Sequence, residues 1–221
     1  MVADLLEHEA NLKFSTKIKD NGQSNREILF GYLGNHFYEN LGINIIFGQK
    51  VDKIFDDIFL PLQLMESISM TKNSQLNKLS NDTKTLNKQQ ITTSFSVFNN
   101  VFTLLLVLSV IIFVPKTWLT NSYLIVMAVI GTFLFLVGFY SFHEEVSANY
   151  NIILFNPLLI LLVVMQNKLV RKTILFILIA SLTIYTFYML NKPFLLLILP
   201  FIVTNYVIFY RLLKKQYQSV R

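Results

Sequence analysis

Five apolar runs follow one another in the second half of the chain. Each is about 17 to 25 residues long and has no internal charge, which suits an α-helix that crosses a hydrocarbon core of about 30 Å. Short polar breaks separate the runs, and none shows the alternation of a membrane β-strand. The runs cover residues 99–115, 118–142, 150–166, 173–190 and 194–210. The sequence therefore predicts an all-α membrane protein with five transmembrane helices.

Composition agrees with this class and excludes several kinds of chemistry. Hydrophobic residues make up 53% of the chain and charged residues 14%, whereas soluble domains carry about 25% charged residues. Cysteine is absent, so this chain has no disulfide, thiolate metal site or cysteine nucleophile. The net charge of +6 does not indicate nucleic-acid binding, because residues 1–100 hold ten Lys/Arg against eleven Asp/Glu and residues 101–221 hold nine against two. The positive excess lies in the membrane half and indicates topology.

The positions of Lys and Arg predict the orientation in the membrane. With residues 1–100 outside, eight positive charges fall on inside segments, and the outside turns between the runs hold only Lys192, as the positive-inside rule requires. The inside residues are Lys116, Lys168, Arg171, Lys172, Arg211, Lys214, Lys215 and Arg221. The polar loop between the second and third runs then faces outward, and the tail of residues 214–221 is cytoplasmic.

Residues 1–97 are predicted to form a small, mostly helical extracytoplasmic segment ahead of a membrane domain over residues 98–213. An apolar stripe predicts a helix over residues 25–42 that ends at Gly42. Gly48 predicts a break, and Pro61 predicts the first turn of another helix. Residues 71–97 are predicted to be a polar connector.

Export of the first segment needs an explanation, because the opening "MVADLLEHEANLKF" has neither a basic start nor an apolar stretch of signal-peptide length. Either the first apolar run carries the preceding residues outward unaided, or the chain is the downstream part of a longer protein whose exported beginning precedes it. We favour the second interpretation.

The stretch "SFHEEVSANYNIILFNPLL", residues 141–159, places polar side chains between two apolar runs. Polar side chains at this place would lie at headgroup level and could offer hydrogen bonds to a substrate. The alternative is a solvated turn that caps two helices, and the sequence leaves both open. A metal site is not expected, because the His-Glu-x-x-His spacing is absent, and no cofactor is expected.

Two stretches resemble the Lnb-type bacterial lipoprotein N-acyltransferase family. "LGINIIFGQKVDKIFDDIFLPLQLMESI", residues 41–68, is similar to the late part of that family's exported domain. The family also carries a His, an Asn six residues on, another Asn two further and a Pro six beyond, between its second and third spanning helices. These positions hold His143, Asn149, Asn151 and Pro157 here. The resemblance makes His143, Asn149 and Asn151 the candidate substrate-facing residues. The resemblance covers roughly residues 25–70 and 98–213.

The resemblance implies an exported cysteine-hydrolase-like domain joined to a five-helix domain in the bacterial inner membrane, which together move an acyl chain onto the N-terminal amine of a lipoprotein. This chain departs from the pattern, since it lacks the reactive cysteine and has Phe142 where an acidic residue is expected. We therefore expect it to anchor the enzyme and help to position lipid or lipoprotein, without being catalytic alone. The alternative is a complete small non-enzymatic membrane protein that serves as an anchor, assembly factor or transporter subunit. The expected partners are membrane lipid and a lipoprotein, and the sequence does not indicate the oligomeric state.

Overall fold

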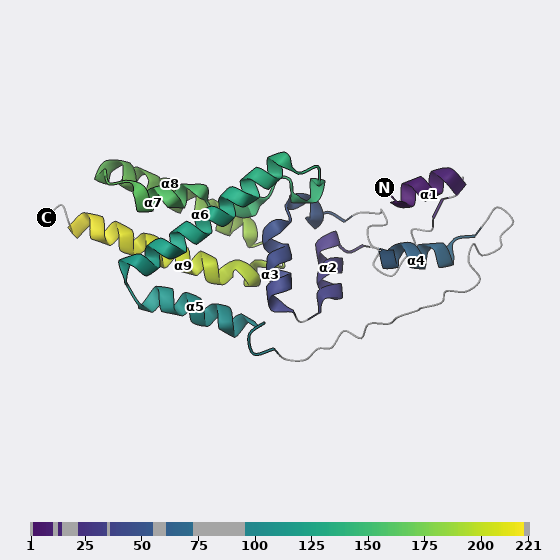
Figure 1. Cartoon of the computed structure of the whole chain (residues 1–221), viewed down its shortest axis with the longest axis horizontal. Helices are drawn as coiled ribbons and strands as arrows, with labels where there is room; N and C mark the ends of the chain where they lie inside the picture. The colour runs from purple at the N-terminus through teal and green to yellow at the C-terminus, as the bar shows by residue number, and fades with distance from the viewer. Residues whose placement is uncertain are drawn as a thin grey trace. The chain divides into compact units, whose positions relative to one another are not determined.

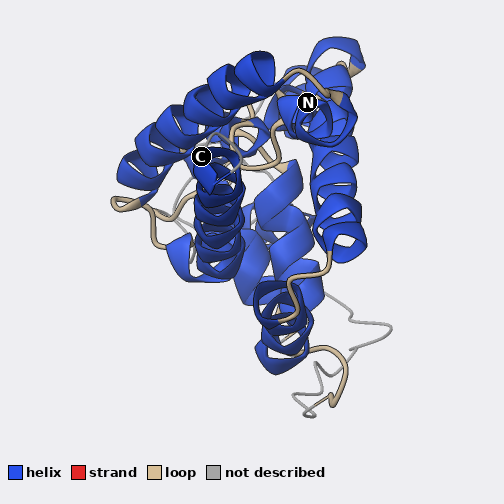
Figure 2. Ribbon diagram, turned by 90° about the vertical axis from the view of Figure 1, so that its left-hand side faces the viewer, coloured by secondary structure: helices blue, strands red, loops and turns tan. Residues whose placement is uncertain are grey.

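The computed structural model describes residues 2–10, 13–14, 22–34, 36–54, 61–72 and 96–218. The regular elements in these ranges are all helical, and no β-strand occurs among them (Figure 2). The predicted all-α class is therefore confirmed for the described part of the chain. Most of the predicted connector over residues 71–97 lies outside the described residues.

The chain forms two compact units. The first comprises residues 1–34 and 51–94, and the second comprises residues 35–50 and 95–221. This division differs from the predicted boundary near residue 98, because residues 35–50 pack with the apolar helices of the second unit.

The described part of the first unit contains three short helices, α1 (Val2–Ala10), α2 (Asn25–Leu33) and α4 (Pro61–Met70). α2 begins with a capping box, in which the backbone N–H of Glu27 donates to Ser24 Oγ and the N–H of Ser24 donates to the Glu27 carboxylate. The Arg26 side chain is fully buried, and its Nε donates to the Asp52 carboxylate over 2.6 Å. This pair joins α2 to the end of η1 (Gln49–Asp52), so the buried guanidinium has the carboxylate partner it needs.

The predicted helix over residues 25–42 is wrong in its extent. α2 ends at Leu33 because Gly34 adopts a positive φ of 60°, which favours glycine and cannot continue an α-helix. A new helix, α3 (Phe37–Ile46), begins after it and runs through Gly42. The predicted break near Gly48 is confirmed, and Pro61 is the first described residue of α4, since residues 55–60 lie outside the described ranges.

The second unit is a bundle of longer helices with α3 lying across one end (Figure 1). α9 packs against both α5 and α8, and it also contacts α3. The long bundle helices are α5 (Val101–Phe113), α6 (Thr117–Tyr140), α8 (Lys168–Met189) and α9 (Leu195–Gln218). Their shared apolar core includes Leu124, Leu178 and Ile202, each almost completely buried.

Three helices are long and apolar enough to cross a membrane by length and composition. They are α6, α8 and residues Leu195–Gln216 of α9, and they mark the chain as a membrane protein. The two remaining predicted runs form shorter apolar segments, α5 and Tyr150–Val164. α5 has 13 residues, which at about 1.5 Å per residue gives about 20 Å.

The predicted third run, residues 150–166, is not one continuous helix. It forms η3 (Tyr150–Ile152), a turn, η4 (Pro157–Ile160) and α7 (Leu161–Val164). The break has a local cause, because Pro157 lacks a backbone N–H and Oδ1 of Asn156 accepts from the N–H of Leu158 over 3.0 Å.

One side of this irregular segment lies in the core of the bundle. Phe155 and Leu162 are fully buried, and the segment packs mainly on α6. A Cβ atom on Gly131 of α6 would lie 1.3 Å from the carbonyl oxygen of Phe155, so only glycine leaves room for this approach.

Candidate functional site at the polar loop

The polar loop holds the last carbonyl groups of α3. Nδ2 of Asn149 donates to the carbonyl oxygens of Ile45 and Ile46, each over 2.8 Å. Nδ2 of Asn151 donates to the carbonyl oxygens of Asn44 and Ile45 over 2.7 and 3.1 Å. The last four carbonyls of a helix have no partner within the helix. The two amides therefore cap the C-terminal end of α3 from more than a hundred residues away in the sequence.

The backbone of the loop also pairs with the residues that follow α3. The N–H of Gly48 donates to the carbonyl of Glu145 over 2.8 Å, and the N–H of Gln49 donates to the carbonyl of Ala148 over 3.3 Å. A Cβ on Gly48 would lie 2.0 Å from the carbonyl oxygen of Ser147. Ala148 has a positive φ of 49°, uncommon for a residue with a side chain. Contacts with residues 48 and 49 thus hold the loop in this turn.

Asn151 is the residue on which these contacts converge. Its side chain is completely buried, and its Oδ1 accepts a hydrogen bond of 2.7 Å from the hydroxyl of Tyr185 in α8. Its backbone N–H donates to Oδ1 of Asn149 over 2.9 Å. One asparagine therefore joins α3, the loop and α8.

His143 lies apart from this network. Its side chain is 83% exposed, and its Nδ1 is 3.9 Å from a carboxylate oxygen of Glu145. Of the three candidate residues, the structure brings Asn149 and Asn151 together in the core and leaves His143 at the surface. Whether any of the three meets a substrate stays a prediction.

A second polar network lies deeper in the bundle. Nδ2 of Asn205 in α9 donates to the carbonyl of Leu154 over 3.3 Å, and the hydroxyl of Tyr123 in α6 donates to Oδ1 of Asn205 over 2.9 Å. Leu154 lies in the break between η3 and η4, so Asn205 provides a donor where the helical ladder is interrupted. Sequence analysis did not single out either side chain. The available signal was an asparagine inside an otherwise apolar run.

A third contact ties the start of α3 to the residues ahead of α5. Nδ2 of Asn99 donates to the Glu39 carboxylate over 2.7 Å, and Oδ1 of Asn99 accepts from the N–H of Tyr38 over 2.8 Å. The hydrogen bond from Asn99 is the main reason why the pKa of Glu39 lies below its ordinary value.

The buried amides of the loop have a structural role, because they bind the end of α3. No group of three or more His, Asp or Glu side chains that could hold a metal occurs within the described ranges. The buried polar groups of the loop, Asn149 and Asn151, are amides that bind backbone carbonyls and the Tyr185 hydroxyl. Such an arrangement fixes the position of a segment and is not a nucleophile paired with a base.

Comparisons of the chain with protein-family models, with curated proteins and with solved structures returned no match. The resemblance to the Lnb-type acyltransferase family therefore stays a prediction, carried by residues 41–68 and by the spacing from His143 to Pro157.

Proposed function

We propose that this chain is the membrane-anchoring part of a lipoprotein N-acyltransferase-like protein of the bacterial inner membrane. Five apolar segments cross the bilayer, and the bundle holds the segment that precedes it at the outer surface. Catalysis then depends on a thiol that this chain does not carry.

The observation that carries this proposal is the capping of α3 by Asn149 and Asn151. α3 belongs to the sequence ahead of the first apolar run, yet its last carbonyls are bound by a loop between two later runs. A buried amide with several good partners fixes one geometry, because breaking it leaves polar groups unpaired in the core. The bundle is thus suited to hold an outer segment at a set position above the lipid.

Five crossings are supported by the course of residues 150–164 along α6. Phe155 lies against Gly131 in the middle of α6, and Leu162 lines the same pocket as Thr117 at the start of α6. The 3₁₀ geometry of η3 and η4 rises about 2.0 Å per residue, against about 1.5 Å in an α-helix. This greater rise helps a short segment to traverse the depth of a longer helix.

The two ends of the bundle differ in charge, as the proposed orientation requires. Arg171, Arg211 and Lys215 line one pocket at the end where α6 begins, and Lys168 lines an adjoining pocket. At the other end, Lys192 lies over the rings of Tyr150 and Tyr188. The polar loop shares this second end and faces outward if the basic end is cytoplasmic.

In this proposal the asparagines position the outer segment, and exposed His143 is the candidate for a hydrogen bond to the substrate. The His-Asn-Asn-Pro spacing that resembles the acyltransferase family then has two functions. Asn149 and Asn151 fix the loop, and the loop presents His143 to the substrate.

The test is lipoprotein N-acylation in bacterial cells that lack their own N-acyltransferase. The DNA upstream of the Met1 codon defines the protein to express, and the proposal expects an in-frame exported segment with Cys and His. That protein should restore acylation, and His143→Ala should lower the rate about tenfold at equal membrane abundance, the effect of a lost hydrogen bond to a charged group. Phe142→Ala is the matched control at the neighbouring exposed position.

Two results would contradict the proposal. A stop codon and ribosome-binding site directly ahead of Met1 would favour the small non-enzymatic membrane protein. If His143→Ala acylates at the wild-type rate, the histidine does not contact the substrate. The loop then has only the structural role of capping α3 through Asn149 and Asn151.

A further inference from the structure

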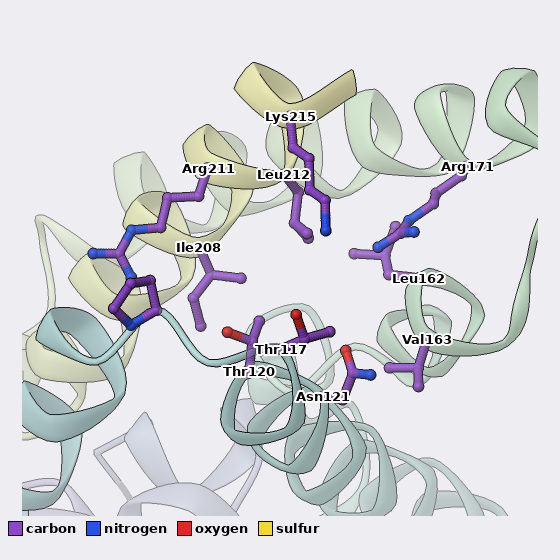
Figure 3. Close-up of a pocket in the computed structure, with 11 residues that line it drawn as sticks. Thr117, Thr120, Asn121, Leu162, Val163, Arg171, Ile208, Arg211, Leu212 and Lys215 are labelled. Atoms are coloured by element: carbon purple, nitrogen blue, oxygen red, sulfur yellow. The ribbon is translucent and has the colours of Figure 1, made fainter. Parts of the chain in front are cut away.

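A pocket of about 360 Å³ lies at the end of the bundle where α6 and α8 begin and α9 ends (Figure 3). This is the opposite end of α6 from the polar loop. The pocket lies within the second unit, and neither Asn149 nor Asn151, which cap α3, lines it. Its volume falls in the range of about 300–1,000 Å³ that is common for small-molecule sites.

Two cationic side chains point into the pocket from different helices. Figure 3 shows the ammonium group of Lys215 in α9 and the guanidinium group of Arg171 in α8 directed toward the same space. Arg211 also lines the pocket, but its guanidinium points away from that space, and Nη2 donates to the carbonyl of Ile112. Arg171 and Lys215 are therefore the groups placed to meet a ligand.

Among the residues that the structure describes, no carboxylate lines the pocket. The acidic residues of the whole chain beyond residue 100 are Glu144 and Glu145, and both belong to η2 (Glu144–Val146) at the other end of α6. Two like charges that approach one space without a counter-charge repel each other. An anion bound between Arg171 and Lys215 would remove this cost.

The opposite wall offers neutral hydrogen-bonding groups. Thr117, Thr120 and Asn121 lie in the first turns of α6, and Figure 3 shows their polar atoms on the side of the pocket that faces the cations. The N-cap residue of α6 makes no side-chain capping bond, and the positive end of the helix dipole adds to the attraction for an anion. Hydroxyl, amide and guanidinium groups together suit the several oxygens of a phosphate.

Apolar side chains complete the lining and favour a phosphate that belongs to a lipid. Leu162, Ile208 and Leu212 form part of the same walls, which suits a ligand with a glycerol or acyl portion better than a free ion. Trp118, adjacent to Thr117, is 66% exposed, as a tryptophan at the level of lipid headgroups would be.

We infer that this pocket binds the phosphate of an anionic phospholipid headgroup between Arg171 and Lys215. Basic pockets between membrane helices on the cytoplasmic side are suited to such headgroups. The inference does not depend on acyl transfer, since it requires only that the apolar helices lie in a bilayer.

The test is a titration of the purified chain in detergent with phosphatidylglycerol, with phosphatidylcholine and with inorganic phosphate, followed by native mass spectrometry. Phosphatidylglycerol should bind at least about tenfold more tightly than phosphatidylcholine, and Lys215→Gln and Arg171→Gln should each weaken that binding by about tenfold. Lys214→Gln is the matched control, because it removes the same charge one residue away and does not line the pocket. It should change the affinity by less than about twofold. The melting temperature of each variant in phosphatidylcholine checks its folding.

Three outcomes would overturn the inference. Equal binding of the two lipids by the wild type would show that the pocket does not select an anion, whatever the variants do. Equal losses in Lys214→Gln and Lys215→Gln would indicate diffuse attraction to the basic end. Displacement of phosphatidylglycerol by millimolar inorganic phosphate, with tighter binding of the free ion, would assign the pocket to a soluble phosphate compound.

Discussion

The hydroxyl of Tyr185 donates a hydrogen bond of 2.7 Å to Oδ1 of Asn151, and both side chains are completely buried. Because Nδ2 of Asn151 donates to the carbonyls of Asn44 and Ile45, this one amide connects α8 to the end of α3. Both the acceptor and the donor of the amide are used. Loss of either partner would leave buried polar groups without a hydrogen bond, which costs more than an average hydrogen bond contributes.

The first prediction concerns this connection. Asn151→Ala should lower the free energy of unfolding by at least about 1–3 kcal/mol, because it removes the acceptor of the Tyr185 hydroxyl and a donor to the α3 carbonyls. Tyr185→Phe should cost about 1 kcal/mol or more, since it strands Oδ1 of Asn151. A double-mutant cycle, measured by unfolding in detergent, should show a smaller combined loss than the sum of the two. Tyr140→Phe, at a residue that is 90% exposed, should change little, and full additivity would contradict the connection.

The second prediction separates His143 from Asn149. Asn149→Ala removes two donors to α3 and the cap of η3, so it should cost about 1–2 kcal/mol. His143→Ala alters an exposed side chain and should stay within about 0.5 kcal/mol of wild type. Melting temperatures of the purified variants measure both. Equal losses of stability in the two variants would mean that the histidine also helps to hold the end of α3.

Hydropathy predicted the location of the long helices well and their ends less well. α6 covers Thr117–Tyr140 against a predicted run of 118–142. α8 begins at Lys168, five residues before the predicted 173, because Oδ1 of Asn167 caps it and its charged first turn is still helical. Hydropathy marks where charge ends, whereas hydrogen bonding decides where a helix begins.

The hydrogen-bond partners in the candidate site could not be predicted from the sequence. The spacing of Asn149 and Asn151 marked the loop as unusual, but their partners are carbonyl oxygens of Asn44, Ile45 and Ile46. Every residue has a backbone carbonyl, so no sequence motif indicates which carbonyl a side chain will bind. Asn205 and Tyr123 likewise meet across 82 positions of sequence, a pairing that follows only from the packing of α6 against the broken segment and α9.

The third prediction tests the proposed crossings, and the cysteine-free chain allows single cysteines to be introduced without background. Ser147→Cys should react with a membrane-impermeant maleimide in intact cells, because the loop faces outward in the proposed orientation. Gln166→Cys and Ser219→Cys should react only after permeabilisation. Labelling of Ser147→Cys and Gln166→Cys from the same side would show that residues 150–164 do not cross the membrane.

The fourth prediction concerns pH. The pKa of Glu39 is lowered in the folded protein, chiefly by the hydrogen bond from Asn99. Its contribution to stability is therefore present at pH values above its ordinary pKa and is lost as the pH falls through the lowered value. Asn99→Ala should move the pKa of Glu39 upward, measured by NMR titration of labelled glutamate carboxyl carbons. An unchanged titration would show that Asn99 does not hold the carboxylate.

The final prediction uses two glycines of α6 as a matched pair. Alanine favours a helix interior over glycine by about 1 kcal/mol, so both Gly131→Ala and Gly138→Ala gain the same local term. At Gly138 the nearest atom to a new Cβ is a carbonyl oxygen 3.9 Å away, an ordinary contact, and the variant should melt at or slightly above the wild-type temperature. At Gly131 the new Cβ would meet the carbonyl oxygen of Phe155 at 1.3 Å, so the buried segment must move away. Overpacking of this kind costs about 1–3 kcal/mol or more, which exceeds the helix gain, and Gly131→Ala should melt well below Gly138→Ala. Equal melting temperatures would show that the broken segment does not pack against the middle of α6.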